Sequence, residues 1–319
     1  MVAASPGISP SSSSKISSRA LGFALFLLLL VAIFWSQLAS LVGLTLHDDS
    51  STHILFIPAI AMFLIYLSRK RVFHDTKSSC ATGTILLLAG TGVCCLGIMR
   101  TQTWRESNFL FEIILSFVLL VIGGFIFWFG MAAFRKAAFP LSFLLLMVPL
   151  PGLILDKVVH LLQAGSTAIA YDLFRLFSVP VLRDQFVLVL PGFAVEVAKE
   201  CSSIRSSLAL FIAALLAAHL YLRRPWSKFV LVALAIPLAV FKNGVRIFTL
   251  CMLAIHVDPG FLTGKLHREG GVVFYCFALL ILGAVLCILR LTEKPRSVDD
   301  LSPRRDGLTG WVPTSSKCQ

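Results

Sequence analysis

Long apolar runs separated by short polar or charged stretches recur along almost the whole chain. Several of them reach the roughly 20 residues that a helix needs to cross a hydrocarbon core about 30 Å thick. We place them at residues 20–44, 53–68, 81–99, 108–134, 137–151, 202–222, 228–255 and 270–291. The pattern predicts an all-α polytopic membrane protein with about eight transmembrane helices.

Two intervening stretches depart from this pattern. Between residues 153 and 177, charged and amide side chains are interspersed with apolar ones, which favours an amphipathic helix lying at the membrane interface. The β-branched stretch 186–197 is interrupted by Pro191 and Gly192, which is typical of a turn between two short strands. We therefore expect an interfacial amphipathic helix and a short β-hairpin on the outer side.

Both ends of the chain are polar. Residues 1–19 are rich in serine and proline, and residues 292–319 are polar and contain proline, so both ends are expected to be disordered. The apolar run after Arg19 is longer than the core of a signal peptide, and we interpret it as a retained first span. The prediction is a single transmembrane domain at 20–291 with disordered cytoplasmic ends.

Composition indicates that lipid surrounds most of the protein. Hydrophobic residues make up 57% of the 319 positions and charged residues only 14%, which leaves too little polar surface to cover a soluble globule. The formal charge of +12 does not indicate nucleic-acid binding, because the cations form short clusters between apolar spans rather than one basic face. Membrane lipid is an expected partner, and nucleic acid is not.

Basic residues in the short loops predict the orientation of the spans. Three loops carry them, at residues 69–77, 135–136 and 223–228. With eight spans, these loops lie on one side together with both termini. That side is expected to be the cytoplasm, and residues 152–201 and 256–269 are expected on the outer side.

The eight cysteines do not form an obvious metal or disulfide pattern. They show no CxxC spacing, and several lie inside apolar runs, where cysteine acts as a small hydrophobic residue. We expect no cofactor, no metal site and no disulfide framework.

Three chemically useful side chains fall at a similar depth. Counted from the basic loop residues that flank their spans, Cys201, Arg246 and His267 are 22, 18 and 23 residues away. At about 1.5 Å per helical residue, these separations correspond to roughly 33, 27 and 35 Å. A thiol, a guanidinium and an imidazole from separate helix ends are therefore expected near the outer interface.

Each of these residues suits a step of cysteine-based catalysis. Cys201 begins a span, where unpaired backbone N–H groups and the helix dipole favour a thiolate nucleophile. Arg246 is suited to hold that thiolate or to stabilise an oxyanion, and His267 to deliver a proton to a leaving amine. Asn243 and Arg205, each about one helical turn from one of these groups, are supporting candidates.

At these residues the chain resembles the exosortase/archaeosortase family of membrane-embedded cysteine transpeptidases. The resemblance covers roughly residues 110–290 and depends on several ordered motifs. They are MVPLP at 147–151, VEVAKECSSIRSS, FKNGVRI and HREGGVVF. Ser203 stands where the family commonly has glycine after Cys-Ser.

The resemblance implies a nucleophile at Cys201, a catalytic arginine at Arg246 with Asn243 before it, and a catalytic histidine at His267. The implied partners are exported proteins with a PEP-CTERM-like C-terminal signal, which consists of a short motif, a transmembrane helix and a basic tail. The enzyme would cleave near the motif, hold the new C-terminus as a thioester and transfer it to an amine or similar acceptor. The implied setting is the bacterial inner membrane, with the active site facing the periplasm or exterior.

Other functions are open from the residues alone. A transporter would use intramembrane polar residues as a solute path, but the spans contain few acidic residues and no internal repeat. A non-catalytic factor in envelope or exopolysaccharide assembly would need neither Cys201 nor His267. Each candidate residue also has a structural interpretation, because an interfacial cysteine, arginine or histidine can simply pack, extend to headgroups or be solvated.

Overall fold

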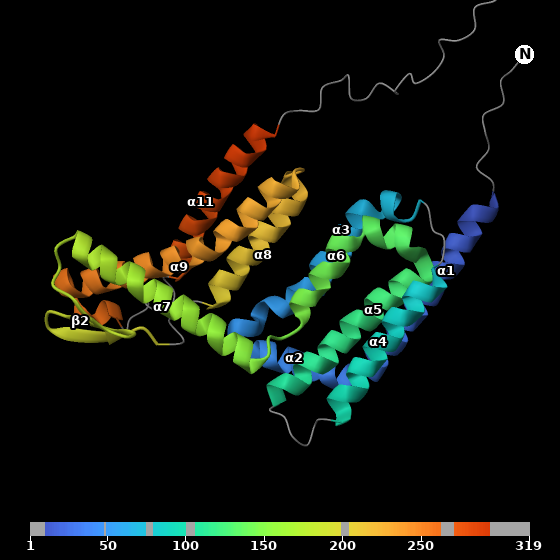
Figure 1. The fold of residues 1–319 in the computed structure, drawn as a ribbon, viewed down its shortest axis with the longest axis horizontal. Coiled ribbons are helices and arrows are strands. Elements are labelled where there is room, and N and C mark those ends of the chain that lie inside the picture. Colours follow the sequence, from blue (N-terminus) through green and yellow to red (C-terminus); the bar gives the residue numbers. More distant parts are fainter. Residues whose placement is uncertain are drawn as a thin grey trace, which may run out of the picture.

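The computed structural model describes residues 10–47, 49–74, 79–99, 106–198, 204–262 and 271–293, which are mostly helical (Figure 1). The α-helices are α1 (Pro10–Ile33), α2 (Trp35–His47), α3 (Ile57–Val72), α4 (Cys80–Met99), α5 (Glu106–Lys136), α6 (Ala138–Phe143), α7 (Gly152–Leu176), α8 (Ile204–Tyr221), α9 (Pro225–His256) and α11 (Gly271–Thr292). The 3-10 helices are η1 (Asp49–Phe56), η2 (Leu144–Met147) and η4 (Pro259–Leu262). Of the two ends predicted to be disordered, residues 1–9 and 294–319 lie outside the described residues, whereas residues 10–19 belong to α1 and were wrongly predicted to be disordered.

Within the described parts of the chain, seven helical segments are long and apolar enough to cross a membrane. They are residues 51–72, 81–99, 109–136, 152–176, 204–221, 225–256 and 271–292. The consecutive helices α1 and α2 are bent by 70° relative to each other and add an eighth span if the pair counts as one. The predicted all-α polytopic membrane fold with about eight transmembrane helices is confirmed.

The apolar run at 137–151 is too short to be the separate span that the sequence predicted. It forms α6 and η2, an apolar helical segment from Ala138 to Met147. Ten residues at about 1.5 Å each extend only about 15 Å, which is half of a hydrocarbon core. Pro149 and Pro151 follow it, and proline has no N–H with which to continue a helix.

Helix α7 has the length of a span but not the direction of its neighbours. It is 25 residues long and runs obliquely to α8 and α11 (Figure 1). Asp156 and Lys157 near its beginning are exposed, whereas Gln163, Ser166 and Thr167 near its middle are buried. The helix is amphipathic, as predicted, and the polar side chains of its middle turns face the protein.

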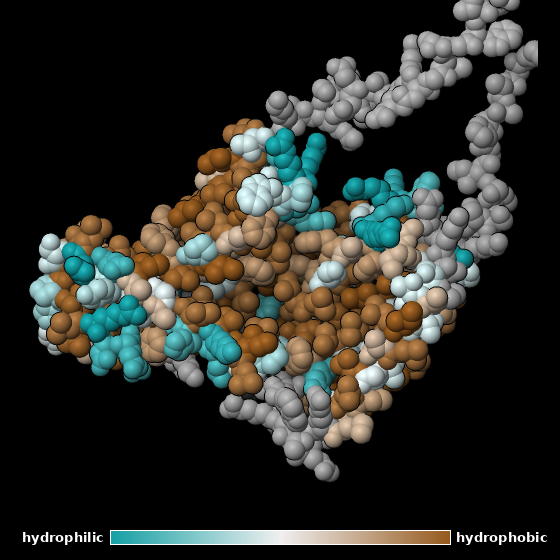
Figure 2. Space-filling view, in the orientation of Figure 1, coloured by the Kyte–Doolittle hydropathy of each residue, from teal (hydrophilic) through white to brown (hydrophobic). Residues whose placement is uncertain are grey.

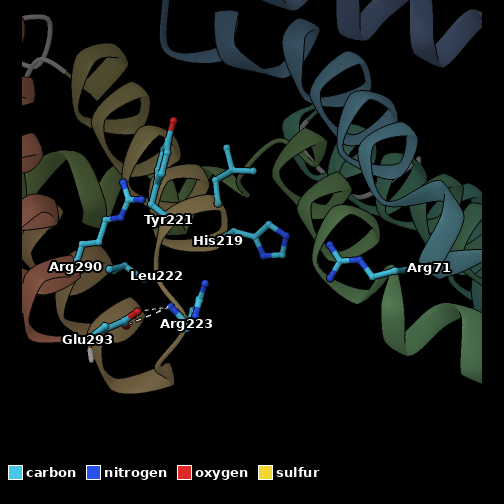
Figure 3. A pocket seen from close by; sticks show the side chains of 8 residues that line it. Arg71, His219, Tyr221, Leu222, Arg223, Arg290 and Glu293 are labelled. Atoms are coloured by element: carbon cyan, nitrogen blue, oxygen red, sulfur yellow. Dashed lines mark hydrogen bonds between the residues drawn. The ribbon is translucent and has the colours of Figure 1, made fainter. Parts of the chain in front are cut away.

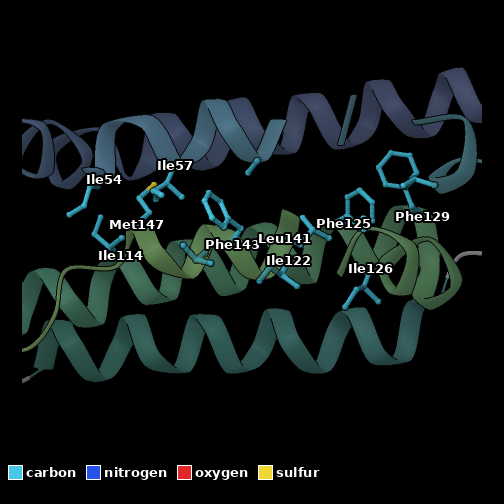
Figure 4. Packing of buried hydrophobic residues seen from close by; sticks show 14 of the residues in the cluster. Ile54, Ile57, Ile114, Ile122, Phe125, Ile126, Phe129, Leu141, Phe143 and Met147 are labelled. Atoms are coloured by element: carbon cyan, nitrogen blue, oxygen red, sulfur yellow. The ribbon is translucent and has the colours of Figure 1, made fainter. Parts of the chain in front are cut away.

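The N-terminal half of the molecule packs around α5. Figure 4 shows buried side chains of α3, α5, α6 and η2 meeting in one apolar layer, among them Ile57, Ile122 and Met147. Helix α4 lies against the other side of α5 at Gly83, where a Cβ would be 2.7 Å from the backbone of Phe127. The missing side chain permits this close approach, as small residues do between membrane helices.

The C-terminal half is formed by α8, α9 and α11, with α7 lying along α9. Leu210, Leu231 and Ala278 are fully buried where α8, α9 and α11 meet. Pro237 lies inside α9. Proline inside a helix removes one backbone hydrogen bond, and Figure 1 shows the part of α9 beyond its midpoint following α7.

A small antiparallel sheet follows α7. Its strands are β1 (Leu182–Asp184), β2 (Val187–Leu190) and β3 (Phe193–Glu196), in the order β1-β2-β3. The predicted hairpin is the pair β2–β3, which has Val189 opposite Ala194, and β1 is an additional strand. Gly192 in the connecting turn has φ +96°, a conformation that favours glycine.

The two polar ends of the molecule are separated by a broad hydrophobic surface (Figure 2). Leu88, Met99 and Leu280 are among the large apolar side chains that are exposed in the structure, as expected where lipid is the solvent. The C-terminal end of α3, the α5–α6 junction and the α8–α9 connection lie along one edge in Figure 1, and the sheet lies at another. The three basic loops therefore share one side of the molecule, as the sequence predicted.

Candidate active site

Two of the three predicted catalytic residues lie outside the described residues. In the chain, Cys201 falls between β3 and α8, and His267 falls between η4 and α11. Their distances from Arg246 therefore stay a prediction. Arg246 and Asn243 lie on α9, and Arg205 is an exposed residue in the first turn of α8.

Asn243 is buried between α9 and α7. Its side chain is only 1% exposed, and Nδ2 donates a 3.1 Å hydrogen bond to Oγ of Ser166 on α7. The Ser166 hydroxyl donates in turn to the carbonyl oxygen of Val240 at 3.5 Å. Because a buried amide needs such partners, these contacts hold Asn243 in one orientation, one helical turn before Arg246.

Glycines bring α7 and α9 close together at this point. A Cβ on Gly244 would lie 2.6 Å from Cγ2 of Ile169 and 3.1 Å from the carbonyl oxygen of Ser166. On the facing helix, a Cβ on Gly165 would lie 2.7 Å from Cγ1 of Val240. The absence of side chains at both positions allows the polar groups of the two helices to come within hydrogen-bond distance.

A buried lysine beside Asn243 is part of the site, although the sequence analysis did not single it out. Lys242 is 3% exposed, and its Nζ donates a hydrogen bond to Oγ of Ser206 on α8. Arg246 lies four residues further along α9, so two cationic side chains occupy successive turns. A sequence signal existed, because two basic residues at helical spacing inside the apolar run FKNGVRIF are costly in a membrane unless they have a role.

The middle of α7 contacts the segment that leads to Cys201. Gln163 is buried, and its Nε2 donates a hydrogen bond to the carbonyl oxygen of Val197. The N–H of Val197 donates to the carbonyl oxygen of Phe186 at 2.9 Å. The chain is therefore held by α7 and by the sheet until four residues before the predicted nucleophile.

An apolar layer beneath the sheet keeps these contacts in place. Leu188 of β2 and Val197 are fully buried against Phe174 of α7 and Ile247 of α9. Burying a large aliphatic or aromatic side chain contributes about 1.5–3 kcal/mol. The layer joins the sheet to the same two helices that carry Gln163 and Arg246.

Four buried polar side chains and the partly buried Ser206 form a set that we call the polar network, contributed by three helices. It consists of Gln163, Ser166, Asn243, Lys242 and Ser206. Ser206 lies in the first turn of α8, so the ammonium group of the network sits at the positive end of that helix dipole. An anion that forms beside this helix end would be stabilised by both.

The described residues include no cluster of three or more His, Cys, Asp or Glu side chains suited to a metal ion. The described part of the site offers hydroxyl and amide groups together with the cationic side chains of Lys242 and Arg246. Their chemistry is stabilisation of negative charge.

The sequence was compared with known protein families. Residues 45–284 match the family described as transmembrane exosortases, which is most of the chain. The chain belongs to the transmembrane exosortase family. No match was found among curated proteins or among solved structures.

Membership in the exosortase family extends the region that the motifs alone indicated. The motif resemblance covered roughly residues 110–290, whereas the family match begins at residue 45 and therefore includes α3 and α4. The matched exosortase region contains the polar network together with Cys201, Arg246 and His267. The membrane domain of an exosortase is thus the setting in which the site must act.

Proposed function

We propose that this protein is a membrane-embedded cysteine peptidase and transpeptidase, with Cys201, Arg246 and His267 as its catalytic residues. The observation that carries the proposal is the hydrogen bond from the buried Lys242 to the partly buried Ser206, which places a cation at the first turn of α8. That helix starts three residues after Cys201. A helix N-terminus and a nearby cation both favour the thiolate form of a cysteine.

The proposed reaction has two acyl-transfer steps. The Cys201 thiolate attacks the carbonyl carbon of the scissile peptide, and Arg246 stabilises the negative charge on its oxygen. The C–N bond breaks as His267 donates a proton to the leaving amine, which leaves a thioester on Cys201. An amine or similar acceptor then attacks the thioester carbonyl carbon and gives its proton to His267, which is neutral after the first step. The C–S bond breaks and releases the Cys201 thiolate.

Asn243 acts in this proposal as a positioning residue. It lies one turn before Arg246, and its amide is held by Ser166. A neighbouring side chain that is itself held by a hydrogen bond helps to fix the geometry of a catalytic group. The hydrogen bond from Gln163 to Val197 serves the same purpose for the segment that enters Cys201.

The proposed substrates are exported proteins with a PEP-CTERM-like C-terminal signal, which combines a short motif, a transmembrane helix and a basic tail. The three basic loops lie along one edge of the protein, and the positive-inside rule assigns that edge to the cytoplasm. The basic tail of a substrate obeys the same rule. Its cleavage motif would then lie at the outer face of the bacterial inner membrane, on the side of the sheet.

The test is to express the full chain with a tagged substrate and to follow removal of the C-terminal signal. Cys201→Ala is expected to abolish processing, and Arg246→Lys to reduce it by at least about tenfold, because lysine lacks the planar donor fork of arginine. Cys276→Ala is the matched control, because Cys276 is an exposed cysteine on α11. The wild-type chain should yield a hydroxylamine-sensitive adduct that mass spectrometry maps to Cys201.

Normal processing by Cys201→Ala would overturn the proposed chemistry. If both Cys201→Ala and His267→Ala also restore function in a deletion strain, the protein acts as a non-catalytic factor in envelope assembly. An adduct on another cysteine would move the nucleophile and leave the peptidase class intact.

A further inference from the structure

A polar cavity lies at the edge of the molecule that carries the basic loops. It has a volume of about 560 Å³ and lies between α3, the α8–α9 connection and the end of α11. Its lining residues are Arg71, His219, Leu220, Tyr221, Leu222, Arg223, Arg290 and Glu293. It is at the opposite end of α8 from Ser206 and the polar network, so it is separate from the candidate active site.

Arginines from three different elements surround this cavity. Arg71 is in the last turn of α3, Arg223 is in the α8–α9 connection and Arg290 is in the last turn of α11. In Figure 3 the side chain of Arg71 extends toward His219 from one side, and Arg223 and Arg290 lie on the other side of His219. All three arginines are exposed to the cavity or the surface.

The one carboxylate in the lining is engaged with the backbone. Glu293 accepts hydrogen bonds from the N–H of Arg223 at 2.9 and 3.2 Å and from the N–H of Arg224 at 2.9 Å. Desolvation raises the pKa of Glu293, but these backbone hydrogen bonds outweigh it and hold the pKa below its ordinary value. The carboxylate fixes the loop that carries Arg223, and three guanidinium groups still outnumber its single negative charge.

The other residues that line the cavity include a stacked histidine and two partly exposed apolar side chains. The His219 ring stacks on Phe139 of α6 with a centroid distance of 3.7 Å and an interplanar angle of 3°. Leu220 and Tyr221, which also line the cavity, are about half exposed, and Leu291 beside Arg290 is 85% exposed. The cationic cavity thus borders exposed apolar side chains, with Leu220 and Tyr221 in its lining and Leu291 next to Arg290 in the chain.

We propose that this cavity binds the phosphate of an anionic phospholipid headgroup, with the acyl chains lying along the apolar surface of Leu220, Tyr221 and Leu291. Guanidinium groups match phosphate oxygens in charge and in geometry, and basic pockets between membrane helices suit anionic headgroups. A zwitterionic lipid brings its own cation and is disfavoured by the arginines. Because Arg71 belongs to the N-terminal half and Arg223 and Arg290 to the C-terminal half, the bound phosphate joins the two halves.

The test is native mass spectrometry of the full chain in a neutral detergent, titrated separately with phosphatidylglycerol, phosphatidylcholine and glycerol phosphate. We expect one phosphatidylglycerol to bind about tenfold more tightly than phosphatidylcholine. The double variant Arg71→Gln with Arg290→Gln should lose that preference. Arg135→Gln is the matched control, because Arg135 is an exposed arginine in the last turn of α5 at the same edge but does not line the cavity.

Three results would overturn the proposal. The first is equal binding of phosphatidylglycerol and phosphatidylcholine. The second is an equal loss of the preference for phosphatidylglycerol in Arg135→Gln, which would indicate diffuse charge attraction. The third is competition by glycerol phosphate that is as strong as that of the lipid, which would indicate a site for soluble anions. The thermal midpoint of each variant in phosphatidylcholine checks folding. If the double glutamine variant is unfolded, Arg71→Lys with Arg290→Lys replaces it, and loss of guanidinium geometry should still weaken phosphatidylglycerol binding several-fold.

Discussion

At the scale of single residues, the contact of Lys242 with Ser206 is the most informative feature of the described site. An ammonium group that is 3% exposed among membrane helices has lost its water and needs hydrogen-bond acceptors inside the protein. Ser206 supplies one from the first turn of α8. The same contact couples α9, which carries Arg246, to the helix that begins after Cys201.

A double-mutant cycle tests this coupling. Ser206→Ala should lower the free energy of unfolding by about 1–3 kcal/mol, because it removes an acceptor from a buried charged donor. In a Lys242→Met background, Ser206→Ala should lower the free energy of unfolding much less, since the ammonium group is absent. Reversible unfolding of the four chains in mixed detergent micelles measures both values.

The control for this cycle is Ser142→Ala, which changes an exposed serine on α6 and should be nearly neutral. Equal costs of Ser206→Ala in the wild-type and Lys242→Met chains would show that the hydrogen bond contributes nothing to stability.

At the scale of elements, the close pairing of α7 with α9 decides the shape of the site. The two helices meet at Gly165 and Gly244, and polar side chains flank this contact on both helices. Without the close approach, the 3.1 Å hydrogen bond between Asn243 and Ser166 would not form.

Gly244→Ala should separate these helices and lower the stability of the protein. The added Cβ would lie 2.6 Å from Ile169 and 3.1 Å from the carbonyl oxygen of Ser166; overpacking of this kind typically costs about 1–3 kcal/mol. Gly283→Ala on α11 is the control, because a Cβ there meets no atom within 4 Å and alanine favours a helix. The thermal midpoint in lipid nanodiscs, together with the rate of substrate processing, should fall for Gly244→Ala alone.

At the scale of the whole molecule, the two polar ends differ in charge and in structure. The sheet and its turns occupy one end, and three basic loops occupy the other. Basic loops stay on the cytoplasmic side during insertion. This asymmetry predicts that the sheet lies on the outer face of the membrane.

Cysteine labelling checks that orientation. Gln185 lies in the turn between β1 and β2, Arg135 lies in the last turn of α5, and both are exposed. A membrane-impermeant maleimide should label Gln185→Cys in intact spheroplasts but should label Arg135→Cys only after permeabilisation, each relative to the wild-type chain. The reverse pattern would put the site on the cytoplasmic face and exclude the proposed substrates.

The sequence predicted some residues of the candidate site better than others. Arg246 and Asn243 were correctly assigned to one helix, because helical spacing is visible in FKNGVRI. Gln163 was recognised as a polar residue on an amphipathic helix, but its burial against Val197 was not foreseen. Lys242 was missed, although a second basic residue beside Arg246 in an apolar run was a signal. The sequence does not show which neighbour accepts the hydrogen bond of that lysine.

The sequence by itself determined the membrane class, most of the spans, the Pro191–Gly192 hairpin turn and the common side of the basic loops. These features depend on the length of an apolar run or on local backbone chemistry, which a few adjacent residues encode. Only the tertiary structure decided that the polar middle of α7 faces inward. It alone paired Lys242 with Ser206, 36 positions away, and Asn243 with Ser166, 77 positions away, because such contacts depend on how whole helices pack.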